Sequence, residues 1–168
     1  GTSNLDVIDV DGAANFAADV TFADGADIIT ASAGTSNFRA GVNAGNSIES
    51  GGNYNTVVGD EAGTAITTGD GNSLVGKDAG RLITTGQYNT TVGFDSLENT
   101  TTANDNTAMG YYSLQANTTG ASNAAFGRQA LASNTTASNN TAVGYFSLAA
   151  NTTGTVNTAV GMSALAAN

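Results

Sequence analysis

The chain has 168 residues, of which 22 are Gly and 40% are hydrophobic, and it contains no Pro, Cys, His or Trp. Without Cys or His it lacks disulfides, thiolate and imidazole metal ligands, cysteine nucleophiles and the usual general base. Fourteen acidic residues against four basic ones give a net charge of −10, which repels nucleic-acid phosphates and anionic membranes. We therefore expect no nucleic-acid partner, no membrane insertion, and no metal or other cofactor.

Residues 1–36 differ from the rest of the chain. Apolar residues alternate with Asp over Leu5–Gly12 and Val20–Gly25, and both segments end on Asp-Gly. This pattern is typical of short strands joined by tight turns. It predicts a β-rich shaft or linker segment that ends near residues 33–37.

The carboxylates of this segment are candidate calcium ligands, because Ca²⁺ prefers oxygen donors. Their spacing matches neither an EF-hand loop nor the nonapeptide of calcium β-rolls, so we interpret them as solvated turn residues. They are Asp9, Asp11, Asp24 and Asp27.

From residue 37 onward the chain is a repeat of the motif Asn-x-x-x-Gly. Seven copies follow one another at a spacing of 17 residues, and an imperfect eighth begins at Asn37, one residue out of step. A short fixed period is typical of a solenoid, in which each repeat forms one coil. The sequence predicts an all-β parallel β-solenoid, or β-roll, of about eight coils over residues 37–168. The regular copies begin at Asn55, Asn72, Asn89, Asn106, Asn123, Asn140 and Asn157.

Each coil can be numbered from its Asn at position 0. Gly at position 4 predicts a turn with positive φ or a close backbone approach, and Ala or Ser at position 7 predicts a tight inner corner. Thr-Thr at positions 12 and 13 predicts a second short strand, and the Asn residues predict turns and amide stacking between coils. Position 3 is always apolar, which predicts the core. Its members are Val58, Val75, Val92, Met109, Phe126, Val143 and Val160.

Positions 8 and 11 exchange their character along the chain. The first regular coils have Gly63 with Ile66 and Gly80 with Ile83, whereas from Asn89 onward position 8 is Leu and position 11 is Thr or Asn. Because a packed interior has a fixed volume, this exchange indicates that both positions face the same core.

A helical alternative is disfavoured, because Gly, Asn and Thr-Thr in every repeat each cost several tenths to about 1 kcal/mol in a helix. A coil this thin buries little area and leaves an apolar side exposed. Association of identical chains remedies this, and three-fold packing is the leading option for a fibre. We expect an intertwined or packed homotrimer.

Two of the repeats resemble a known class of proteins. Segments 106–120 and 140–154 open with Asn-Thr-Ala-x-Gly and close with Asn-Thr-Thr-Gly. They are similar to repeats of phage tail-fibre and tail-spike proteins and to the β-roll heads of trimeric autotransporter adhesins, and the similarity extends over about residues 37–168. The resemblance implies a homotrimer, no enzymatic activity, and a role as a shaft or receptor-contacting head. The period is longer than that of the adhesin heads, which favours the phage-fibre branch.

Positions 5 and 6 vary most and are predicted to face outward. Aromatic side chains there are candidates for contact with receptor sugars. The alternative is a ladder that packs between coils or between subunits, and we favour that alternative. The candidates are Phe94, Tyr111, Tyr112, Tyr145 and Phe146.

The Thr-Thr pairs raise the possibility of ice binding, although adjacent residues of a strand face opposite sides and only one of each pair could be displayed. Asn-x-Thr motifs, which match glycosylation acceptors, arise automatically from the repetition. They begin at Asn89, Asn99, Asn117, Asn134, Asn139 and Asn151.

Paired carboxylates are the only catalytic candidates, at Asp60-Glu61 and at Asp95 with Glu98, and nothing predicts a cleft around them. We therefore expect no enzyme and no catalytic residues. The chain starts without Met and stops within a repeat, so we expect an excerpt of a longer protein. The functional hypothesis is a structural segment of a phage tail fibre or surface adhesin, extracellular or on a virion. The alternatives are a glycan- or ice-binding module and a subunit of an extracellular filament, glycosylated if the source is eukaryotic.

Overall fold

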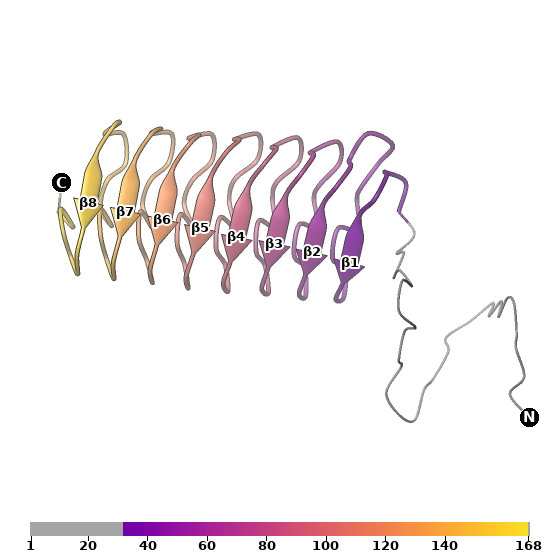
Figure 1. The fold of residues 1–168 in the computed structure, drawn as a ribbon, viewed down its shortest axis with the longest axis horizontal. Coiled ribbons are helices and arrows are strands. Elements are labelled where there is room, and N and C mark those ends of the chain that lie inside the picture. Colours follow the sequence, from indigo (N-terminus) through magenta and orange to yellow (C-terminus); the bar gives the residue numbers. More distant parts are fainter. Residues whose placement is uncertain (1–31, 168) are drawn as a thin grey trace, which may run out of the picture.

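The computed structural model describes residues 32–167, which form a single rod (Figure 1). Eight three-residue strands form one sheet in chain order, and every neighbouring pair is parallel. From β2 onward, strands pair at an offset of 17 residues, so that Val57 lies opposite Leu74. The predicted parallel β-solenoid is confirmed, and no helix occurs within residues 32–167. The strands are β1 (Phe38–Ala40), β2 (Thr56–Val58), β3 (Ser73–Val75), β4 (Thr90–Val92), β5 (Thr107–Met109), β6 (Ala124–Phe126), β7 (Thr141–Val143) and β8 (Thr158–Val160).

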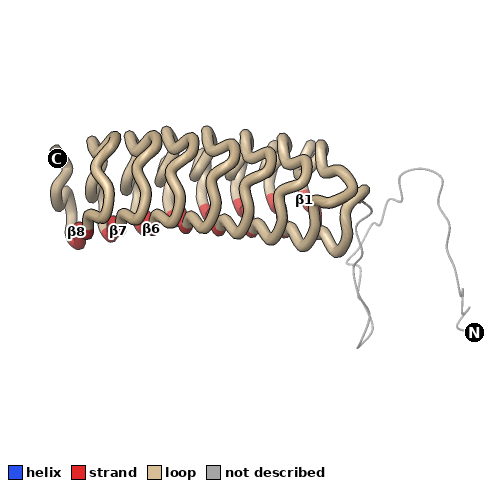
Figure 2. Tube along the Cα trace, turned by 90° about the horizontal axis from the view of Figure 1, so that it is seen from above, coloured by secondary structure: helices blue, strands red, loops and turns tan. Residues whose placement is uncertain are grey.

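The strands form one row along the rod, and turns close the rest of each coil (Figure 2). The predicted second strand at the Thr-Thr pairs is wrong, because in the described coils these residues lie at bends. They still join adjacent coils. The N–H and Oγ1 of Thr84 both donate to the carbonyl of Thr101, at 2.8 and 3.1 Å. A bend is sufficient here because the side chain adds a hydrogen bond that a strand would lack.

The imperfect copy forms a true coil. Phe38 in β1 pairs with Thr56 in β2, and the extra residue lies between Glu49 and Asn53. Glu49 N–H bonds to Thr67, whereas Asn53 N–H bonds to Asp70 Oδ1. The predicted shaft over residues 1–36, with its four candidate aspartates, lies almost wholly outside the described residues.

The strand faces opposite to the predicted direction. Position 3 points outward, whereas position 2 is buried: Leu74 is fully buried, and its neighbour Val75 is 38% exposed. The prediction failed because it treated Asn at position 0 as a turn residue. This Asn points inward, and since side chains alternate along a strand, position 2 must also point inward and positions 1 and 3 outward.

The inward Asn side chains form a ladder through the rod. The backbone N–H and the Nδ2 of Asn72 both donate to Oδ1 of Asn55, at 2.9 and 3.1 Å, and Nδ2 also donates to the Gly86 carbonyl at 2.9 Å. The same bonds recur from coil to coil, and Asn72, Asn89 and Asn106 are fully buried. A buried amide is stable only when its hydrogen bonds are made, and the repetition makes them in every coil.

Gly at position 4 serves both predicted purposes. Gly110 has a φ of 137°, and a Cβ added there would lie 2.6 Å from the carbonyl of Gly127 in the next coil. Any side chain at this position would force adjacent coils apart. The small residues of position 7 are buried as predicted, for example Ala79 and Ser113.

The core exchange is confirmed, and it involves three positions instead of two. In the coil of Asn72 the interior contains Leu74, Gly80 and Ile83, whereas in the coil of Asn123 it contains Ala125, Leu131 and Asn134. A Cβ on Gly80 would lie 2.8 Å from Cδ1 of Ile83, which shows that Ile occupies the space that Leu fills in later coils.

The backbone stays the same across this exchange. Gly63 and Gly80 at position 8 have φ values of 54° and 57°, and Leu131 has 53°. The later coils therefore hold a buried Leu in the left-handed region, where an L-residue is strained by about 1–2 kcal/mol. Their position 11 forms a second amide ladder, in which Asn134 Nδ2 donates to Asn117 Oδ1 at 3.0 Å and to the Ala137 carbonyl at 2.9 Å.

Candidate binding surfaces

The outward side of the sheet is a long apolar face. We define the outer sheet face as positions 1 and 3 of β2–β8. Position 1 is Thr, Ser or Ala, and position 3 is Val, Met or Phe, so the face carries no charge. The apolar side chains of position 3 are 37% to 44% exposed in β3–β7. A continuous exposed apolar stripe on a protein surface is typical of an interaction site.

Position 5 lies beside this face, just beyond the Gly turn, and the structure brings three of the five aromatic candidates together there. Phe94 stacks on Tyr111 with ring centroids 5.7 Å apart and planes 21° apart. Tyr145 lies two coils beyond Tyr111. The three rings are 40% to 42% exposed. We call Phe94, Tyr111, Arg128 and Tyr145 the aromatic column.

The other two candidates, at position 6, are half-buried instead of outward-facing. Tyr112 packs against Tyr111 with centroids 4.0 Å apart, and Phe146 meets Tyr145 edge-on at 4.4 Å. Position 6 turns inward because its residues have positive φ, 58° at Tyr112 and 56° at Phe146. The rings therefore pack within and between coils, as the alternative interpretation predicted. Contact with a receptor stays a prediction.

Arg128 completes the aromatic column. Its Cζ lies 5.5 Å from the ring centre of Tyr111 and 5.6 Å from that of Tyr145, so the guanidinium lies between the two rings. Cation–π contacts at this distance hold a guanidinium in place. The sequence interpretation missed this residue because it treated the four cations as scattered. The signal that could have found it is its position 5 in a coil flanked by coils with Tyr at position 5.

Two groups near the start of the column have shifted pKa values. Burial, followed by the negative charges of Glu98 and Asp78, raises the pKa of Asp95 above its usual range. The hydrogen bond with Tyr111, together with burial and the nearby carboxylate of Asp95, raises the pKa of Tyr112 to about 12. Tyr112 is therefore a neutral hydroxyl at physiological pH, and it donates to or accepts from its neighbours without carrying charge.

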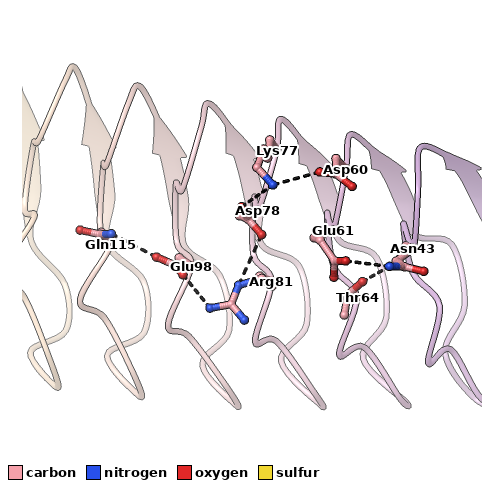
Figure 3. Close-up of polar contacts among 9 residues, drawn as sticks. All are labelled: Asn43, Asp60, Glu61, Thr64, Lys77, Asp78, Arg81, Glu98 and Gln115. Atoms are coloured by element: carbon pink, nitrogen blue, oxygen red, sulfur yellow. Dashed lines mark hydrogen bonds and ion pairs between the residues drawn. The ribbon is translucent and has the colours of Figure 1, made fainter.

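Charged residues of the earlier coils form a chain of contacts from coil to coil (Figure 3). Lys77 Nζ lies 2.9 Å from Asp60 Oδ2 and 3.2 Å from Asp78 Oδ2. Arg81 continues the chain, with Nη2 2.7 Å from Glu98 Oε1.

The end of this chain reaches the next coil, because Gln115 Nε2 donates to Glu98 Oε2 at 3.1 Å. Burial tends to raise the pKa of Glu98, but the hydrogen bonds from Arg81 and Gln115 outweigh it and lower that pKa. The candidate catalytic pairs thus bind cations or amides of adjacent coils: Asp60 bonds Lys77, and Glu61 accepts from Asn43 Nδ2 at 2.7 Å. Within residues 32–167, no group of three or more acidic residues could hold a metal ion.

The Thr-Thr pairs display one residue each, as predicted. Position 12 is half-buried in all but the last pair, and position 13 is exposed in every described coil. The exposed column consists of Thr68, Thr85, Thr102, Thr119, Thr136 and Thr153.

Most of the glycosylation motifs are inaccessible in the folded rod. Asn89, Asn117, Asn134 and Asn151 are buried in the two amide ladders. Asn99 is half-buried, with Nδ2 donating to the Gln115 carbonyl at 2.9 Å, and Asn139 is exposed. A sugar on a ladder Asn would remove the amide protons that the ladder uses, so only Asn139 is fully available as an acceptor.

Between residues 32 and 167, the structure has no helix with the length and apolar character to cross a membrane. Comparisons with known proteins leave the rod geometry as the main guide to function. No family model, curated protein or solved structure matches this chain.

Proposed function

We propose that this chain is a structural segment of a fibre, either a phage tail fibre or a surface adhesin, in which three copies form a rigid rod. The segment extends and stiffens the fibre at a virion or cell surface. It carries no reaction and needs no cofactor. Receptor contact, where it occurs, comes from the side chains beside the shared face, at positions 5 and 6.

The observation that carries the proposal is the outer sheet face. It presents an apolar side chain in every coil from Val58 to Val160, and no charged residue interrupts it. The polar alternation of an ordinary solvent-facing strand is absent, because the interior holds Asn and the outside holds Val, Met or Phe. An apolar stripe of this length is unfavourable in water and is stabilised by coverage.

A second copy of the chain fits this stripe best. The apolar groups recur once per coil, so only a surface with the same period meets them in register along the whole rod. Parallel copies of the same chain have that period. Packing three of them around an axis along the rod turns each outer sheet face toward the axis and repeats one contact in a closed arrangement.

The test is the mass of the particle in solution, measured by sedimentation equilibrium or light scattering. We expect three times the chain mass. Phe126→Lys and Val143→Lys place a charge in the outer sheet face and should convert the trimer to monomers. Thr136→Lys introduces the same charge at an exposed bend position and should leave the trimer intact.

A stable wild-type monomer would refute the trimer. A trimer that tolerates both charged variants would show that another surface joins the copies. Circular dichroism of each variant separates loss of association from loss of fold.

Ice binding is the second candidate, favoured by the exposed threonine column. Its hydroxyls recur once per coil, at the interstrand spacing of about 4.8 Å. Thermal hysteresis and ice-crystal shaping test it directly. Thr102→Lys and Thr119→Lys should abolish any such activity, and its absence in the wild type would remove this candidate.

A further inference from the structure

The later part of the rod carries a single charge. Between Asn106 and Asn168, a stretch of 63 residues, Arg128 is the only Asp, Glu, Lys or Arg. In the earlier coils, Lys77 and Arg81 are both ion-paired with carboxylates. Among the described residues no carboxylate forms an ion pair with Arg128, although the chain as a whole has an excess of acids.

The geometry holds this guanidinium ready for a ligand. Tyr111 and Tyr145 lie on its two sides at 5.5 and 5.6 Å, and the residue is exposed. Rings on both faces restrict the rotation of the side chain and leave the N–H edge of the guanidinium for bonding. Because this order exists before binding, less side-chain entropy is lost when a ligand binds.

The same geometry limits the kind of contact that the aromatic column can make. One face of Tyr111 lies against Phe94 and the other against Arg128. A sugar ring therefore has no free face of Tyr111 on which to stack. The ring edges and the phenol hydroxyls of Tyr111 and Tyr145 remain, and they flank the guanidinium one coil away on either side.

We propose that Arg128, flanked by the hydroxyls of Tyr111 and Tyr145, binds the carboxylate group of an acidic saccharide. A guanidinium fork matches the two oxygens of a carboxylate, and phenol hydroxyls bond the sugar hydroxyls beside it. One cation suits one carboxylate. Nucleic acids and other dense polyanions need several cations in a row, and the acidic earlier coils repel them.

This assignment names the ligand class for the receptor-contacting positions of the proposed fibre. In a parallel trimer the three Arg128 sites lie at the same height along the rod. Three weak sites on one particle then bind a surface coated with the saccharide much more tightly than each site alone.

The experiment uses the whole chain and three defined probes: a sialylated trisaccharide, its carboxyl-reduced form, and the neutral disaccharide that both contain. Binding is measured by surface plasmon resonance on immobilised probe and by saturation-transfer NMR in solution. We expect binding to the sialylated probe alone. Arg128→Gln should weaken it at least tenfold, and Arg128→Lys, which keeps the charge without the fork, should weaken it severalfold.

Lys77→Gln is the matched control, because Lys77 occupies the same position 5 in an earlier coil and is paired with Asp60. It should bind as the wild type does. Equal binding by Arg128→Gln, equal binding to the carboxyl-reduced probe, or no binding to the sialylated or a glucuronic-acid probe would overturn the assignment. Wild-type affinity in Arg128→Lys would overturn recognition by the fork.

The mass of each sample is measured alongside, so the two proposals fail separately. A trimer that ignores every acidic probe refutes the saccharide site and leaves the fibre proposal standing. A monomer that binds the sialylated probe through Arg128 does the reverse.

Discussion

Substitution of Leu131 provides a sharp test of the core. The side chain is fully buried, and its backbone has a φ of 53°. Leu131→Ala removes the buried isobutyl group, which costs about 2–5 kcal/mol of unfolding free energy. It keeps the left-handed backbone, whose strain in an L-residue is about 1–2 kcal/mol. Leu131→Gly releases that strain, because glycine adopts this conformation freely.

The comparison of Ala with Gly isolates the strain. At an ordinary buried site, Gly in place of Ala loses a methyl group worth about 0.8 kcal/mol and about 0.5–1 kcal/mol of chain entropy. The neighbouring Ala130 is equally buried and is not among the residues with positive φ, so Ala130→Gly measures this ordinary loss. At Leu131 the released strain of about 1–2 kcal/mol offsets it. The Gly variant should be about as stable as the Ala variant, or more stable.

Urea unfolding followed by circular dichroism gives both differences, provided that the slopes agree among variants. The reasoning is refuted if Leu131→Gly falls below Leu131→Ala by as much as Ala130→Gly falls below the wild type. That result would mean that the left-handed conformation of the Leu column stores no strain.

Two further predictions concern buried polar groups. Asn106→Ala leaves the N–H of Asn123 and the carbonyl of Gly120 unpaired in the interior, so unfolding free energy should fall by about 2–4 kcal/mol. The exposed Asn104→Ala should lose less than about 1 kcal/mol in the same urea assay, and equal losses would contradict the amide ladder. Asp95→Asn should stabilise the rod at pH 7. Because the folded-state pKa of Asp95 is raised, its carboxylate disfavours folding increasingly as pH rises from the usual aspartate pKa of about 4 through the raised value. Melting at pH 7 and pH 3 checks this: the gain should vanish at pH 3, and an equal gain at both values would contradict the titration.

The sequence was sufficient to predict the period, the parallel solenoid and the compensation between positions 8 and 11. These follow from rules that act on every coil alike, namely equal spacing and fixed interior volume. Gly at position 4 was also predictable, since its lack of a Cβ is needed wherever coils approach closely at that turn.

The direction of the strand was not predictable from polarity. In an isolated strand Val58 would face the core and Asn55 the solvent, but a column of identical amides satisfies its own hydrogen bonds and inverts that order. The Thr-Thr bends failed for a similar reason, because the Thr84 hydroxyl bonds the next coil in place of a strand partner. The place of Arg128 between two rings depends on coils 17 residues away on either side, and no local motif records it.

The Asn ladder also gives the rod a direction of assembly. In each step the amide oxygen of one coil accepts from the coil that follows it, as Asn55 accepts from Asn72 and Asn72 from Asn89. A coil at the growing end therefore exposes an acceptor that the next Asn to arrive completes. As the chain leaves the ribosome, each finished coil acts as the template for its successor. Folding can keep pace with synthesis from the amino-terminal side, with only one incomplete coil open at a time.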